Sequence, residues 1–169
     1  MTKLLVLGVV VAALATPTAP GPSPCWRPPV DAVVVDPFRP PTCPWCPGNR
    51  GIEYATPAGT PIHAVASGTV SFSGTVAGTT YVVVALADGK RITYGNLADP
   101  LVSRGERVVT GQGLGRTAGR FHFGVRLGDH YLDPDRFLGV PRYRVRLLPI
   151  DGSRPVSTPS PRWVCPDER

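Results

Sequence analysis

The side chains in this 169-residue sequence best suited to chemistry are its four cysteines and three histidines. The run 43–46 reads C-x-x-C, a spacing found in thioredoxin-like redox sites and in zinc ribbons. No β-α-β pattern surrounds this run and no second C-x-x-C follows at ribbon spacing, so neither chemistry is favoured. An even set of cysteines in an exported chain instead indicates disulfides. Three pairings are possible, and the one we favour joins Cys43 to Cys46 and Cys25 to Cys165.

Export is indicated by the first residues of the chain. Residues 4–15 form an unbroken apolar run behind Lys3 and end in an A-x-A sequence. This pattern is typical of a secretory signal peptide, and the run is shorter than the roughly 20 residues that a membrane-spanning helix needs. An uncleaved anchor and a core strand are the alternatives. We expect residues 1–15 to be a signal peptide, the mature chain to be secreted or extracytoplasmic in the cell envelope, and no stable membrane span.

The balance of charge is basic, with 18 Lys and Arg side chains against 12 Asp and Glu, and only Lys3 falls within the signal. The arginines are scattered along the chain. Such a balance favours attraction to an anionic surface, such as cell-wall polymer. A nucleic-acid partner is not expected, because no basic helix or sheet motif with interleaved aromatic residues accompanies the charge. A solvated basic surface without a specific partner remains the alternative.

The pattern after the signal predicts an all-β fold. Residues 16–29 read as a proline-rich leader, and from residue 30 onward short β-type runs alternate with glycine and proline. The run 81–86 is continuously apolar, as in a strand buried on both faces, and Asp88-Gly89 signals a hairpin turn. Many short strands between turns predict a sandwich or barrel. The expected strands are 33–35, 68–76, 81–86, 91–94, 107–109 and 121–126.

One helical turn is expected at residues 133–138, because Asp133 can cap it and Pro134 suits its first position. The compact domain should therefore span residues 30–139. Residues 140–169 would hold an edge strand at 142–148 and, after residue 151, a proline-rich tail attached through Cys165.

Several segments, taken in order, resemble the LytM/lysostaphin-type zinc metallopeptidases, peptidase family M23. Residues 92–97 (ITYGNL) are similar to the family's T-x-Y-x-H-L, and 120–126 (RFHFGVR) to its H-x-H-F-E-V-R. The resemblance implies a mostly antiparallel β-sandwich or barrel-like core. The other segments are 48–53 (GNRGIE), 58–64 (AGTPIHA), 67–70 (SGTV), 102–115 (VSRGERVVTGQGLG) and 132–134 (LDP).

The resemblance also implies where a zinc site would lie. Family members bind zinc through H-x-x-x-D and the second histidine of H-x-H, and these positions carry Asn49, Glu53 and His122. The two assisting histidines are replaced by Asn96 and Arg120. A zinc hydrolase needs three protein ligands and a group that exchanges protons near neutral pH. An amide is a poor zinc ligand, and neither an amide nor a guanidinium exchanges protons near neutral pH. No catalytic residue is therefore intact, and no cofactor is expected.

We expect the five matched positions to converge on one groove. Arg120 lies two residues before His122 in a strand, so both side chains point to the same face. Arg120 would then replace zinc as the counter-charge of Glu53, in a metal-free polar cluster with His122. Asn49 and Asn96 would be its hydrogen-bond partners.

The other two histidines, His63 and His130, match no ligand position of the family, and we expect no relocated metal site.

Three functions follow. The chain is expected to be an inactive member that binds peptidoglycan or regulates a cell-wall hydrolase. A divergent zinc endopeptidase that uses Glu53 and His122 to cleave peptide cross-links is the first alternative. A structural secreted domain without a ligand is the second.

Overall fold

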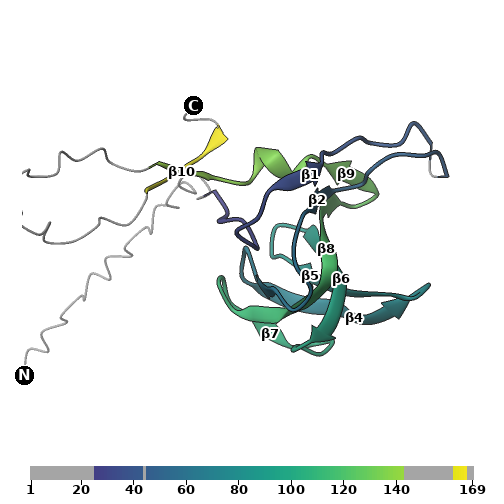
Figure 1. The fold of residues 1–169 in the computed structure, drawn as a ribbon, viewed down its shortest axis with the longest axis vertical. Coiled ribbons are helices and arrows are strands. Elements are labelled where there is room, and N and C mark those ends of the chain that lie inside the picture. Colours follow the sequence, from purple (N-terminus) through teal and green to yellow (C-terminus); the bar gives the residue numbers. More distant parts are fainter. Residues whose placement is uncertain (1–24, 44, 143–161, 167–169) are drawn as a thin grey trace, which may run out of the picture.

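The computed structural model describes residues 25–43, 45–142 and 162–166 (Figure 1). The expected signal peptide and most of the expected strand 142–148 lie outside these residues. Within the described part, no helix is long and apolar enough to cross a membrane. The elements are β1 (Val34–Asp36), β2 (Ile52–Tyr54), β3 (Pro61–His63), β4 (Gly68–Val76), β5 (Thr79–Ala85), β6 (Lys90–Pro100), β7 (Arg107–Val108), β8 (Gly113–Leu127), β9 (His130–Leu132), η1 (Pro134–Arg136), β10 (Val140–Arg142) and β11 (Arg162–Val164).

Nine strands form one sheet in the order β1-β2-β8-β6-β5-β4-β7, and β3 and β9 also pair with β8. Every strand pair in it is antiparallel, so the expected all-β antiparallel fold is confirmed. The longest strand, β8, pairs with four others and runs through the middle of the sheet (Figure 1). Side chains on β8 are therefore positioned by neighbours on both of its edges.

The core lies on one face of β8. Phe121, Phe123 and Val125 are buried there, because successive side chains of a strand point to opposite faces. Tyr94 of β6 packs against Phe123 with ring centroids 5.7 Å apart, and its hydroxyl accepts a hydrogen bond from the backbone N–H of Val65. Burial raises the pKa of Tyr94 well above its ordinary value. The alternate residues of β8 are left to the opposite face, where the site lies.

The local turn and cap expectations are confirmed. Gly89 has φ 85° in the turn between β5 and β6, a conformation that glycine adopts at little cost. Asp133 accepts a hydrogen bond from the backbone N–H of Asp135 at the start of η1, and proline follows the cap.

The expectation that residues 81–86 form a strand buried on both faces is wrong. Val82 and Val84 are buried, whereas the alternate side chains of β5 are half-buried on the face that carries the site.

The two ends of the described chain lie together, while most of the expected leader and tail lies outside the described residues. Trp26 stacks on Phe137 with ring centroids 4.9 Å apart and exchanges backbone hydrogen bonds with Phe137 and Gly139. The leader is thus packed against the domain from residue 25 onward. In the tail, β11 pairs with β10 as a two-stranded ribbon apart from the main sheet (Figure 1). Disulfides join Cys25 to Cys165 and Cys43 to Cys46.

Candidate functional site

The site is built on the face of β8 opposite the core, where β2 and β6 flank it. Glu53 of β2 lies directly across from His122 in the ladder. His122 Nδ1 is 2.6 Å from Glu53 Oε1, and the two side chains are 23% and 19% exposed. Because an ionised carboxylate only accepts hydrogen bonds, Nδ1 carries the hydrogen. Two of the five expected groove residues are therefore locked together by one short hydrogen bond.

Arg120 completes the pairing at the other oxygen of Glu53. Its Nε lies 3.7 Å from Glu53 Oε2, and its Nη2 lies 3.4 Å from Asp36 Oδ2. Arg39 also contacts Asp36, through Nη1 at 2.5 Å and Nη2 at 3.2 Å. The result is a polar cluster of Asp36, Glu53, Arg120 and His122 in which each carboxylate faces a cation or an N–H donor.

Asp36 was missed by the sequence analysis. It ends a short exposed strand, β1, and no motif or spacing links it to Arg120. The pairing arises because β1 lies beside β2, which in turn lies beside β8. Only the order of strands in the sheet brings this second carboxylate to the cluster.

Asn49 takes a different role from the expected one. Its side chain is buried, and Nδ2 donates to the backbone carbonyls of Asp36 at 3.3 Å and Pro37 at 3.2 Å. Its Oδ1 accepts from the backbone N–H of Gly51 at 3.2 Å. Arg39 and Asn49 exchange backbone hydrogen bonds at the base of the intervening loop. Asn49 therefore holds this loop closed and makes no side-chain bond to Glu53, Arg120 or His122 in the described structure.

Asn96 lies beside the cluster on β6, where its neighbour Gly95 faces His122 across the ladder. Asn96 has φ 61°, a left-handed conformation that asparagine tolerates better than most residues. Its Nδ2 donates to the backbone carbonyl of Arg120. Asn96 thus fixes the backbone that carries Arg120 and makes no bond to the Glu53 carboxylate.

The donor set does not fit a catalytic zinc ion. Zinc needs three protein ligands arranged around an open position. Glu53 and His122 are directed at each other, Asn49 is committed to backbone groups, and the guanidinium of Arg120 places a positive charge beside Glu53. Among the described residues, no three His, Cys, Asp or Glu side chains are grouped so as to hold a metal. His63 and His130 lie exposed on β3 and β9.

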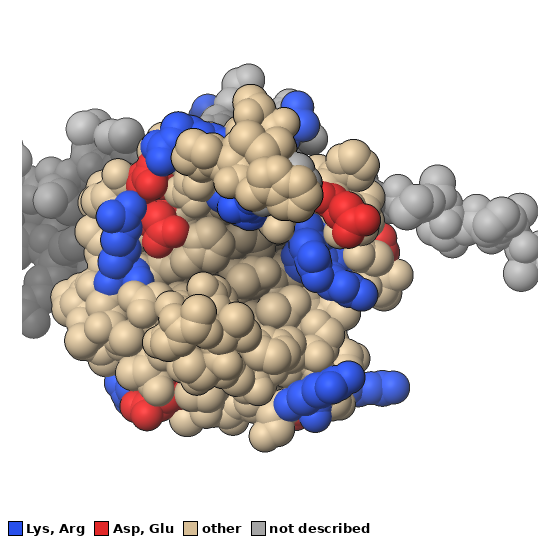
Figure 2. All heavy atoms as spheres, turned by 90° about the vertical axis from the view of Figure 1, so that its right-hand side faces the viewer, with Lys and Arg blue, Asp and Glu red and all other residues tan. Residues whose placement is uncertain are grey.

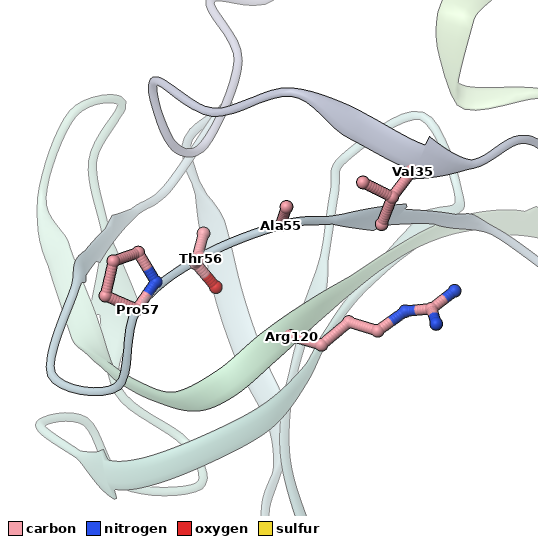
Figure 3. A pocket seen from close by; sticks show the side chains of 5 residues that line it. All are labelled: Val35, Ala55, Thr56, Pro57 and Arg120. Atoms are coloured by element: carbon pink, nitrogen blue, oxygen red, sulfur yellow. The ribbon is translucent and has the colours of Figure 1, made fainter.

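Two hollows adjoin the cluster. One, of about 340 Å³, is lined by Val35, Ala55, Thr56, Pro57 and Arg120, with the Arg120 side chain extending along β2 toward Val35 (Figure 3). The other, of about 310 Å³, includes His122 in its lining and extends over β6 and β5. In the space-filling view of Figure 2, the centre of the face is hollowed and basic side chains stand on both sides of it.

Comparison with known proteins gives one family and several similar folds. The description of peptidase family M23 matches residues 47–134. An uncharacterized protein of Mycobacterium tuberculosis is 32% identical over 124 residues, which cover 66% of this chain and 30% of that protein. The chain thus spans less than a third of the length of this curated relative.

Two solved structures share the fold. Csd3 of Helicobacter pylori superposes with a TM-score of 0.60 and 26% identity, over 68% of this chain and 35% of Csd3. A chain of the SpoIIQ–SpoIIIAH pore forming complex superposes with a TM-score of 0.59 over 68% of this chain and 91% of that chain. At 22% identity the second likeness shows the fold alone.

Proposed function

The chain belongs to peptidase family M23, and we propose that it is a secreted, catalytically inactive member that binds peptidoglycan at the extracytoplasmic cell envelope. Binding to the wall would also suit a protein that regulates a cell-wall hydrolase. The two disulfides support export, because such bridges persist in oxidising compartments.

The observation that carries the proposal is the state of Glu53. In the family pattern its position supplies a zinc-binding carboxylate, but here Oε1 accepts from His122 and Oε2 faces Arg120. A carboxylate held in this way already has its hydrogen-bond donor and its counter-charge. A zinc ion would have to displace both and approach a guanidinium. The cluster is complete without a metal.

The proton-transfer positions support the same conclusion. The guanidinium of Arg120 only donates hydrogen bonds and cannot act as a base toward water. The amide of Asn96 donates a hydrogen bond to a backbone carbonyl but does not carry a proton from one group to another. What remains is a folded groove with polar side chains on its surface, which suits recognition of a ligand better than its hydrolysis.

Purified mature protein with its disulfides intact provides the test. We expect substoichiometric zinc by elemental analysis after incubation with zinc and desalting. We also expect co-sedimentation with purified peptidoglycan and no release of new amino groups from it. Insoluble cellulose serves as the control pellet.

Stoichiometric zinc together with cleavage of peptidoglycan would overturn the proposal in favour of the divergent endopeptidase. Failure to sediment with peptidoglycan above the cellulose control would overturn it in favour of a structural domain without a wall ligand.

A further inference from the structure

The hollow next to His122 is bordered by strands β8, β6, β5 and β9. We call it the arginine hollow and define it by Arg50, Tyr81, His122, Gly124, Arg126 and Tyr131. Three of these residues stand at every second position of β8, so they share the outer face. In the ladders, Arg126 lies across from Tyr131 of β9, and the neighbour of Gly124 on β6 is Thr93. The hollow is therefore built mainly on the sheet, and Arg50 reaches it from the segment before β2.

Gly124 lines the hollow without a side chain. A Cβ atom on Gly124 would lie 3.1 Å from His122 Nε2 and 3.3 Å from the carbonyl oxygen of Arg50. On the neighbouring strand, a Cβ atom on Gly95 would lie 2.8 Å from the ring of Tyr81, so glycine there leaves room for this ring. A side chain at position 124 would crowd His122 and the hollow. The motif H-x-H-F-E-V-R has glutamate where this chain has Gly124, so the same substitution opens space and removes a negative charge.

The charge of the hollow is positive. Arg50 and Arg126 line it, and no carboxylate appears among its described lining residues. Arg126 is half-buried and forms no ion pair within the described part of the chain. Its cross-strand neighbour on β6 is another arginine, Arg91. An unpaired, partly desolvated guanidinium beside a like charge attracts an anion strongly.

Aromatic rings border the two arginines. The guanidinium of Arg50 lies 5.5 Å from the centroid of the Tyr131 ring, a cation–π distance. Tyr81 of β5 also lines the hollow. The hydrogen bond from Nδ1 to Glu53 leaves Nε2 of His122 facing Gly124. The hollow thus combines anion-binding groups with apolar walls.

We propose that the arginine hollow binds the free C-terminal carboxylate of a short peptide. Arg126 holds the carboxylate, and Tyr81 and Tyr131 contact the last residues of the peptide. The proposal rests on the proposed function, because peptides with free carboxyl ends are part of peptidoglycan. A volume of about 310 Å³ accommodates one or two small residues.

An extended polyanion is a poorer occupant. In the cluster that adjoins the hollow, Arg39 and Arg120 are already paired with the carboxylates of Asp36 and Glu53, so they offer no free cation to the next phosphates of a teichoic-acid or nucleic-acid chain. A single negative terminus needs no further cation, because the rest of the peptide is neutral where it passes the cluster.

The probe is diacetyl-L-lysyl-D-alanyl-D-alanine, titrated into the mature protein at low salt and followed by NMR. Its C-terminal amide is the matched control. We expect the amide to bind at least about tenfold more weakly, because a charge-assisted bidentate contact is lost. Equal affinity of acid and amide would overturn the proposal with the native protein alone.

Two variants locate the contact. Arg126→Gln and Gly124→Glu should each weaken binding of the acid by about tenfold or more. Arg107→Gln removes the same charge from an exposed position on β7 and should leave binding unchanged. If Arg107→Gln weakens binding as much as Arg126→Gln, the attraction comes from net charge and the proposal fails. Tighter binding of poly(glycerol phosphate) than of the peptide would also overturn it.

Sedimentation with peptidoglycan, run in parallel, separates this inference from the proposed function. Wall binding that is unaffected by Arg126→Gln, with no preference for the peptide acid, would overturn the inference and leave the proposed function intact. Binding of the peptide acid that depends on Arg126, without sedimentation on whole wall, would support the inference and overturn the proposed function.

Discussion

The two halves of the outer face of β8 differ in whether their charged side chains are paired within the protein. In the polar cluster, the carboxylates of Asp36 and Glu53 are matched by Arg120 and His122 at 2.6–3.7 Å. In the arginine hollow, Arg126 has no carboxylate partner among the described residues. His122 belongs to both halves, with Nδ1 bonded in one and Nε2 facing the other.

The contrast separates stability from recognition. Groups that satisfy one another within the fold have little left to offer a ligand, and an unpaired cation gains most from an incoming anion. We therefore expect substitutions in the cluster to alter stability and metal affinity. Removing the charge of Arg126 in the hollow should alter ligand binding and leave stability nearly unchanged.

The largest expected effect comes from rebuilding the metal site. Arg120→His combined with Asn49→His and Glu53→Asp should tighten zinc binding by about a thousandfold or more. The changes at positions 49 and 53 complete a three-ligand set with His122, and the change at position 120 removes the guanidinium beside it. Competition with a chromogenic chelator measures the change. Arg107→His adds one histidine at an exposed strand position and should have no such effect. Equally tight zinc binding before and after the triple substitution would show that the native site was never lost.

Removing the carboxylate at the centre of the cluster should cost stability. Glu53→Ala leaves the Nδ1–H of His122 without its acceptor in a mostly buried position, and we expect the free energy of unfolding to fall by about 1–3 kcal/mol. Urea denaturation gives this value. Glu53→Gln keeps an acceptor oxygen and should lose less.

Asp31→Ala, at an exposed position outside the sheet, is the control for Glu53→Ala and should change stability by less than about 0.5 kcal/mol. A loss for Glu53→Ala no larger than this control would mean that the cluster contributes nothing to the fold.

The two arginines of β8 provide a direct comparison of the halves. Arg120 is 55% exposed and its contacts with Asp36 and Glu53 are screened by solvent, so Arg120→Gln should cost about 0.5–1 kcal/mol. Arg126→Gln relieves repulsion with Arg91 and should be neutral or slightly stabilising. Thermal unfolding of both variants at low and high salt tests this difference. A larger loss for Arg126→Gln would reverse the assignment of the two halves.

The smallest effect is expected at a turn outside both halves. The hydrogen bond from Lys90 lowers the pKa of Asp88, so its folded pKa lies below the unfolded one. The pair therefore contributes stability above the unfolded pKa of about 4, and this contribution is lost as pH falls through the folded pKa. Asp88 is half exposed, so screening limits the contribution to a few tenths of a kcal/mol.

Asp88→Asn keeps the turn sequence favourable and isolates this charge, because Asn-Gly suits the same hairpin. The free energy of unfolding of this variant should be lower than that of the native protein at pH 7 and equal to it near pH 2. An equal difference at both pH values would point to turn geometry instead of charge.

Local patterns in the sequence predicted the elements whose causes are local. Alternation along β8 placed Arg120 and His122 on one face, and the same period of two places Arg126 there as well. Asp88-Gly89 and Asp133-Pro134 predicted a turn and a cap from the conformations of the residues themselves. The ordered motifs predicted the antiparallel sheet. They also identified Glu53 as a carboxylate whose metal partners had changed.

The sequence by itself thus determined the β-strand pattern, the family and the loss of zinc-binding residue types. The tertiary structure decided the partners. It brought Asp36 to Arg120 across two intervening strand pairings, turned Asn49 toward the backbone of its loop, and packed Trp26 on Phe137. Alternation repeats every two residues and acts within one strand, whereas the contact of Asp36 with Arg120 depends on strand order and that of Trp26 with Phe137 on packing between segments distant in the sequence. Many distant pairings fix both together.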